Sequence, residues 1–138
     1  MSVTVHGKCL CGKVRIEATL PDQTVEVCHC TMCQAYVGGP YLSTRAVEDY
    51  TIEGEENVRT FRSSDWAERG FCSHCGSALF FHYLPKDSRS FMAGLFEGLS
   101  GPIREEIFID EKPDWLTIEG GQPRLTGAEI MAKVKAEQ

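Results

Sequence analysis

Hydrophobic and polar residues alternate along several short stretches of this chain. Val14, Ile16, Ala18 and Leu20 alternate with charged or polar side chains, and this period of two is typical of a half-buried β-strand. The most apolar run, residues 78–84, predicts a core strand. Further short runs predict strands at residues 3–6, 25–27, 41–44, 49–52, 58–62 and 91–96.

Two segments have a helical pattern instead. Residues 31–36 predict a helical turn, which a Gly-Gly-Pro sequence ends. Residues 126–129, Thr-Gly-Ala-Glu, have the form of a helix capping box. Ile130 and Val134 follow at a spacing of four, so they share one helix face. We therefore expect a short amphipathic C-terminal helix over about residues 126–137.

These elements predict a mainly β fold, and 138 residues are enough for a single domain, 1–138, with a real core. The formal net charge is −6 and no run of Lys or Arg stands out, which argues against nucleic acid or an anionic membrane as the main partner. No stretch resembles a membrane span or a signal peptide. We therefore expect a cytoplasmic protein; the pattern leaves the oligomeric state open.

All seven cysteines fall in three tight clusters, and the odd count argues against a pure disulfide framework. In a reducing compartment such clusters bind metal more often than they form disulfides. Four thiolates saturate a tetrahedral zinc ion, whereas three leave one coordination position open. The clusters are an N-terminal pair (Cys9, Cys11), a triad (Cys28, Cys30, Cys33) and a middle pair (Cys72, Cys75).

Spacing alone allows two ways of sharing these ligands. The last two cysteines of the triad could join the middle pair in a zinc-ribbon-like site. Alternatively, the N-terminal and middle pairs share one ion and the triad holds another. Gly12 and Gly76 directly follow the two pairs, whereas Gln34 follows the triad. Glycine readily takes the left-handed backbone that turns amides toward a metal-bound sulfur, which favours the second arrangement.

The motifs around these clusters resemble the signature of the glutathione-dependent formaldehyde-activating enzyme family, which includes the centromere-protein-V domain. The motifs are Gly7-x-Cys9-x-Cys11-Gly12-x-Val14, Cys28-His29-Cys30-x-x-Cys33 and Arg69-x-Phe71-Cys72-x-x-Cys75-Gly76-Ser77, with Ser64, Trp66, Ala67 and Pro113-Asp114-Trp115 also similar. The resemblance covers about residues 5–118. It implies several coiled β-sheets around zinc, the fold also used by methionine-R-sulfoxide reductases.

The resemblance also implies the sites and the activity. It implies a carbon–sulfur lyase-type enzyme acting on a thiol–carbonyl adduct: glutathione adds to formaldehyde, or a related small aldehyde, giving S-hydroxymethylglutathione. Zinc would be the cofactor, glutathione a possible co-substrate, and a small thiol and a small carbonyl the partners. The implied ligands are Cys9, Cys11, Cys72 and Cys75 for a structural zinc, and Cys28, Cys30 and Cys33 for an open, activity-linked zinc.

The chemistry of an open zinc fits this activity in two ways. It favours the thiolate form of a coordinating thiol, which is mostly protonated when free at neutral pH. It can also activate water or polarise a carbonyl. A different class of function is a non-catalytic zinc-stabilised binding domain, with the triad as a second structural site. The residues that directly follow the triad are candidates to line its pocket: Gln34, Tyr36, Gly38 and Gly39.

Other polar residues carry weaker signals. His29 and His74 lie inside cysteine loops, where we expect hydrogen bonding rather than metal ligation. Several arginines could contact the carboxylates of glutathione, but we expect each to be solvated at the surface. These arginines are Arg45, Arg59, Arg62 and Arg69.

Overall fold

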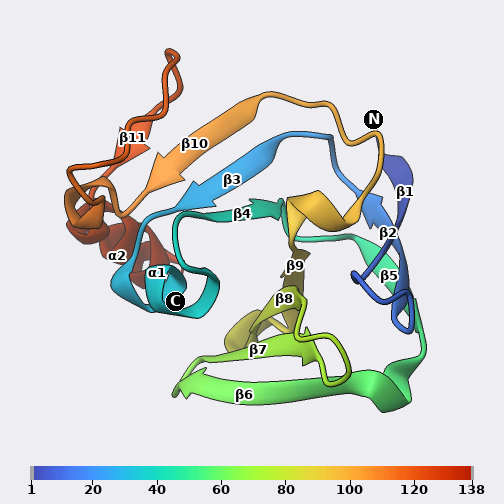
Figure 1. The fold of residues 1–138 in the computed structure, drawn as a ribbon. Coiled ribbons are helices and arrows are strands. Elements are labelled where there is room, and N and C mark those ends of the chain that lie inside the picture. The colour runs from blue at the N-terminus through green and yellow to red at the C-terminus, as the bar shows by residue number, and fades with distance from the viewer. Residues whose placement is uncertain (1, 138) are drawn as a thin grey trace.

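A computed structural model describes residues 2–137, which form three β-sheets (Figure 1). In the first sheet, β1 (Val3–Lys8), β2 (Arg15–Leu20) and β5 (Asp49–Glu53) pair antiparallel in the order β1-β2-β5. The alternation that predicted β2 buries Ile16 and Leu20 and leaves its charged residues exposed.

The second sheet is mixed and leads into the triad. Its order is β11 (Arg124–Leu125), β10 (Ile103–Ile107), β3 (Val25–Cys28) and β4 (Tyr41–Thr44). β10 runs parallel to both β3 and β11, whereas β3 and β4 are antiparallel. Helix α1 (Thr31–Val37) follows β3 directly, which confirms the helical turn predicted there.

The third sheet is antiparallel. Its order is β6 (Val58–Ser64), β7 (Ala67–Cys72), β8 (Ala78–Tyr83) and β9 (Ser88–Phe91). Gly70 in β7 is required by packing, because a Cβ atom there would overlap the ring of Phe80 in the neighbouring strand.

The main core lies between the first and third sheets. Ile16 and Leu20 of β2 belong to one buried cluster with Leu79, Phe80 and Phe91. The rings of Phe80 and Phe91 meet edge to face, with centroids 5.6 Å apart. A smaller buried cluster surrounds the triad and includes Tyr41 of β4.

Helix α2 (Gly127–Ala136) carries the predicted capping box. Thr126 Oγ1 accepts a hydrogen bond from the Glu129 backbone N–H (3.1 Å), and the Thr126 N–H donates to the Glu129 carboxylate (2.9 Å). The helix packs against the turn at Ile109–Glu111, where Asp110 accepts a hydrogen bond from the Gly127 N–H. Within residues 2–137, neither helix is long and apolar enough to cross a membrane.

The mainly β fold with a short C-terminal helix is confirmed, but the strand predicted at residues 91–96 is wrong. β9 ends at Phe91, and a 3₁₀ turn, Ala93–Leu95, follows. Ala and Gly in the middle of this run have low strand propensity, so the chain turns and buries Phe96. The other 3₁₀ turns are Glu55–Asn57, Leu84–Lys86 and Ile109–Glu111.

Candidate metal centres

The N-terminal and middle cysteine pairs meet in one group, which we call the tetrad. Its four sulfur atoms all lie within 4.8 Å of one another. The Sγ–Sγ distances are 3.6 Å for Cys9–Cys11 and 3.9 Å for Cys11–Cys72. A disulfide would need about 2.05 Å, whereas a tetrahedral zinc ion with Zn–S bonds of about 2.3 Å separates its sulfurs by about 3.8 Å. The tetrad therefore fits a saturated zinc site.

Two similar loops build the tetrad. Gly12 and Gly76 adopt left-handed backbones with φ of 80° and 79°, and each donates its N–H back to the first cysteine of its pair. The Val14 N–H donates to the Cys9 sulfur (3.4 Å). The Leu10 N–H donates to Ser77 Oγ (3.0 Å), which ties one loop to the other. Gly12 and Gly76 thus occupy equivalent positions in the two loops. The fold brings the N-terminal and middle cysteine pairs together, and not the zinc-ribbon-like combination.

The triad lies where β3 passes into α1. Cys28 ends β3, Cys30 is the N-cap of α1, and Cys33 lies in its first turn. Their sulfurs lie within 4.8 Å of one another, and within residues 2–137 no further His, Cys, Asp or Glu ligand atom joins this group. Hydrogen bonds with the Cys28 and Cys33 thiols lower the pKa of Cys30, and the Cys33 N–H and the charge of Arg69 act in the same direction. The same sulfur contacts raise the pKa of Cys28. Because the three sulfurs are grouped, they can bind one metal ion and leave one coordination position open.

Arg69 lies against the triad, so the expectation that it is solvated at the surface is wrong. Its side chain is only 3% exposed, because β7 turns it to the same buried face as Ala67. Both terminal nitrogens of the guanidinium lie 3.6 Å from the Cys33 sulfur. Burial disfavours the charged form, but the hydrogen bonds and charge of Cys33, together with the charges of Tyr41 and Cys30, outweigh it and raise the pKa of Arg69.

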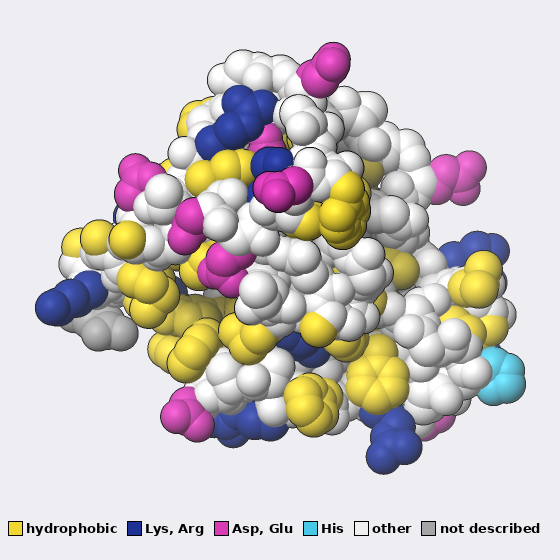
Figure 2. Space-filling model, turned by 60° about the vertical axis from the view of Figure 1, so that its left-hand side comes forward, with side chains coloured by type: hydrophobic (Ala, Val, Ile, Leu, Met, Phe, Trp, Pro, Cys, Tyr) yellow, Lys and Arg dark blue, Asp and Glu magenta, His cyan; other side chains and the backbone are white. Residues whose placement is uncertain are grey.

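A cavity of about 720 Å³ opens beside the triad, and all three triad cysteines line it. Apolar side chains from α2 (Ile130, Met131) and Trp66 of the β6–β7 turn form part of its wall. Figure 2 shows hydrophobic side chains gathered on one face of the molecule, where the surface is hollowed. The volume falls in the range of small-molecule sites, about 300–1,000 Å³.

Comparison with known proteins decides the family. The sequence model of the glutathione-dependent formaldehyde-activating enzyme family matches residues 4–109. The chain belongs to this family. Family membership and the names of the relatives described next indicate a glutathione-related lyase at the level of the family.

Two relatives and one solved structure extend the comparison. An uncharacterized lyase of Schizosaccharomyces pombe is 29% identical over 131 residues, 94% of this chain and 96% of the relative. A Halomonas elongata protein, provisionally named a glutathione-dependent formaldehyde-activating enzyme, is 28% identical over 127 residues, 83% and 81% of the two chains. A Rhodobacter sphaeroides crystal structure has the same fold, with a TM-score of 0.58 and 22% identity, covering 90% of this chain and 99% of the other.

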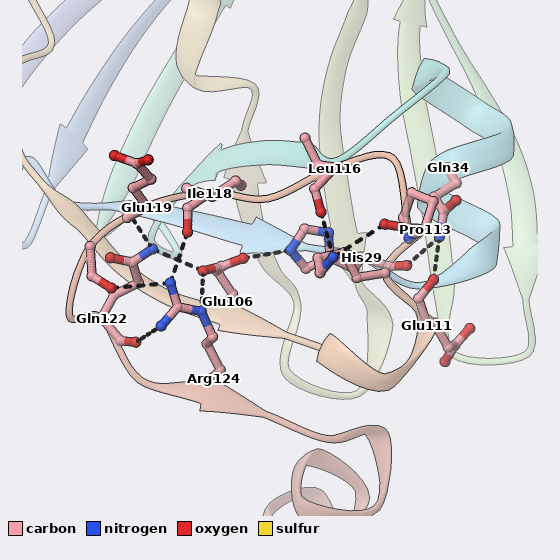
Figure 3. Close-up of polar contacts among 12 residues, drawn as sticks. His29, Gln34, Glu106, Glu111, Pro113, Leu116, Ile118, Glu119, Gln122 and Arg124 are labelled. Carbon is pink, nitrogen blue, oxygen red and sulfur yellow. Dashed lines mark hydrogen bonds and ion pairs between the residues drawn. The ribbon is translucent and has the colours of Figure 1, made fainter.

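In this member of the family, a buried polar network holds the triad loop (Figure 3). His29 is fully buried between two triad cysteines, and its Nε2 lies 2.8 Å from a Glu106 carboxylate oxygen. The second oxygen of Glu106 accepts a hydrogen bond from Gln122 (2.8 Å) and pairs with Arg124 (2.9 Å). His29 therefore hydrogen-bonds rather than joining the metal-ligand group, as the sequence predicted. The sequence carried no signal for its partners, which lie about 80 residues further along the chain.

The four candidate pocket residues lie close to the triad but outside the cavity wall. The side chain of Gln34 donates to the backbone carbonyls of His29 (2.7 Å) and Glu111 (2.8 Å). The Tyr36 hydroxyl donates to the Gly70 carbonyl (3.2 Å). Gly38 ends α1 with φ of 82°, and Gly39 follows it. Contact of Gln34, Tyr36, Gly38 and Gly39 with substrate stays a prediction.

Proposed function

We propose that this protein is a zinc-dependent carbon–sulfur lyase-type enzyme that acts on the adduct of glutathione with formaldehyde or a related small aldehyde. One observation carries the proposal. Among residues 2–137, the triad is a three-cysteine ligand group without a fourth protein ligand, and it opens into a cavity large enough for a small molecule.

Two sets of residues would hold the metal. Cys9, Cys11, Cys72 and Cys75 would hold a structural zinc, and Cys28, Cys30 and Cys33 a second one. The donor sets fit zinc because both consist only of cysteine sulfurs at ligand-sharing distances. Zinc in the triad would supply an open coordination position at which a substrate thiol is favoured as its thiolate.

The protein's own residues would bind and orient the two reactants. The apolar wall formed by Trp66 and α2 would exclude water from the triad and hold the small carbonyl near it. In the synthetic direction a carbon–sulfur bond forms between the thiol sulfur and the carbonyl carbon, and the thiol proton ends on the carbonyl oxygen. In the lyase direction the same bond breaks, and no other reactant is needed.

Exchange NMR tests this proposal directly. The experiment follows the interconversion of glutathione, formaldehyde and their adduct, and we expect the zinc-loaded protein to accelerate it. The Cys33→Ser variant is the control and should not accelerate it. If the wild-type protein leaves the exchange rate unchanged, this substrate pair is wrong. A triad that also ignores added thiols would favour a non-catalytic zinc-stabilised binding domain.

A further inference from the structure

Arg69 differs from the other arginines that line the cavity. Each of those lies close to a carboxylate: the distances are 2.9 Å for Arg45–Asp22, 3.4 Å for Arg89–Asp87 and 2.9 Å for Arg104–Glu26. Among the ion pairs of residues 2–137, Arg69 has no carboxylate partner. Its polar partner is the sulfur of Cys33, which both terminal nitrogens approach at 3.6 Å.

The surroundings of Arg69 fix its guanidinium at this sulfur. The group lies 5.3 to 5.7 Å from the ring centroids of Tyr36, Tyr41 and Phe81, which form an aromatic cage. Its Nε is buried and has no hydrogen-bond partner among the described residues. A buried cation is costly unless an anion offsets it. Aromatic rings attract a cation only weakly by comparison, so the triad sulfurs, as metal-bound thiolates, would be its counter-charge.

The charge balance of the triad gives this cation a role. Three thiolates around a divalent ion carry a net charge of −1, and a fourth thiolate brings the total to −2. In a partly desolvated site this second negative charge is unfavourable without compensation. The fixed positive charge of Arg69, in contact with one ligand sulfur, is placed to compensate it.

We propose that Arg69 is a positioning residue that offsets the negative charge added when a substrate thiolate joins the triad. The proposal deepens the proposed function and rests on it, since it requires a metal in the triad with an open position. It implies that Arg69 makes the triad metal bind an anionic fourth ligand in preference to a neutral one. If the Arg69 side chain only filled the space inside the aromatic cage, replacing it would not alter that preference.

The test compares anionic and neutral ligands on the cobalt-substituted protein. Glutathione and azide are the anionic probes and imidazole is the neutral one, each titrated while the visible absorption of cobalt is recorded. Arg69→Gln removes the charge but keeps hydrogen-bond donors, and Arg69→Lys keeps the charge. Arg59→Met is the matched control, because Arg59 is an exposed arginine on β6, next to β7.

We expect Arg69→Gln to weaken binding of the anionic probes by about 10- to 100-fold, the range for a lost charge-assisted hydrogen bond, and to leave imidazole binding unchanged. Arg69→Lys should recover most of this loss, and Arg59→Met should match the wild type. Should Arg69→Gln fail to fold, Arg69→Met, which fills the cage with an apolar chain, makes the same comparison.

The outcomes separate the two proposals. If the neutral variants bind anionic and imidazole probes in the same ratio as the wild type, the role of Arg69 is overturned. If the wild type binds azide but not glutathione, the proposed substrate fails, while the azide-to-imidazole ratio still decides the role of Arg69. An azide preference that is lost in Arg69→Gln and kept in Arg69→Lys supports it.

Discussion

Removing one cysteine from the tetrad should unfold the protein, whereas removing one from the triad should not. Cys11 and Cys72 are 61 positions apart in the sequence, so the tetrad closes a long loop. A cross-link of that span restricts the unfolded chain by about 4 kcal/mol, and a structural zinc contributes about 10–16 kcal/mol in small domains. Total domain stability is only about 5–15 kcal/mol. We therefore expect the Cys75→Ser variant to be unfolded already, so that heating it shows no cooperative unfolding transition.

Cys33→Ser is the corresponding substitution in the triad, and we expect it to leave the protein folded. The backbone around it keeps other support, since the Thr31 N–H donates to Glu111 and Gln34 donates to the His29 carbonyl. We expect a folded variant that retains one zinc, against two in the wild type and a misfolded Cys75→Ser protein. Metal analysis measures the number of zinc ions bound, and thermal unfolding followed by circular dichroism shows whether each variant is folded.

Ser73→Ala is the matched control, because Ser73 is exposed in the same loop as Cys75 and acts there through its backbone N–H. It should keep two zincs and the wild-type unfolding temperature. If Cys33→Ser unfolds as completely as Cys75→Ser, the triad is structural as well, and the two sites do not differ as we expect. A Cys75→Ser protein that stays folded with two zincs would equally contradict a structural role for the tetrad.

Three further substitutions test the packing and polar networks. Glu106→Gln should lower the unfolding free energy in urea by about 1–2 kcal/mol, because it takes the carboxylate away from buried His29 and from the more exposed Arg124; an unchanged value would contradict that role. Gly70→Ala should cost about 1–3 kcal/mol by overlap with Phe80, whereas Gly121→Ala, with open space around it, should not. Thr126→Ala should cost about 1 kcal/mol, seen as faster amide hydrogen exchange in α2 alone; slower or equal exchange would contradict the cap.

The parts of the structure that the sequence predicted depend on local signals. The period of two in β2, the capping box of α2 and the glycines after the cysteine pairs each act within a few residues, so they can be recognised without the fold. Ligand grouping followed from the same local signal, because Gly12 and Gly76 mark two equivalent loops.

The burial of Arg69 and the composition of the cavity wall could not be predicted in this way. β7 carries Glu68 and Arg69 in its centre, so its sequence does not predict a strand, although it pairs with β6 and β8 along its two edges and has one buried face. The cavity combines α2 with residues more than 60 positions away, such as Trp66. These contacts depend on tertiary packing, which no short window of sequence contains.

Cadmium-113 NMR of the fully loaded protein tests whether the triad is one ligand short and accepts a thiol. We expect two resonances, one from the tetrad that does not respond to glutathione and one from the triad that shifts when glutathione is added. The Cys33→Ser variant should lose only the second resonance. Two resonances that both ignore glutathione would contradict this expectation, because the triad ion would then already be capped by the protein.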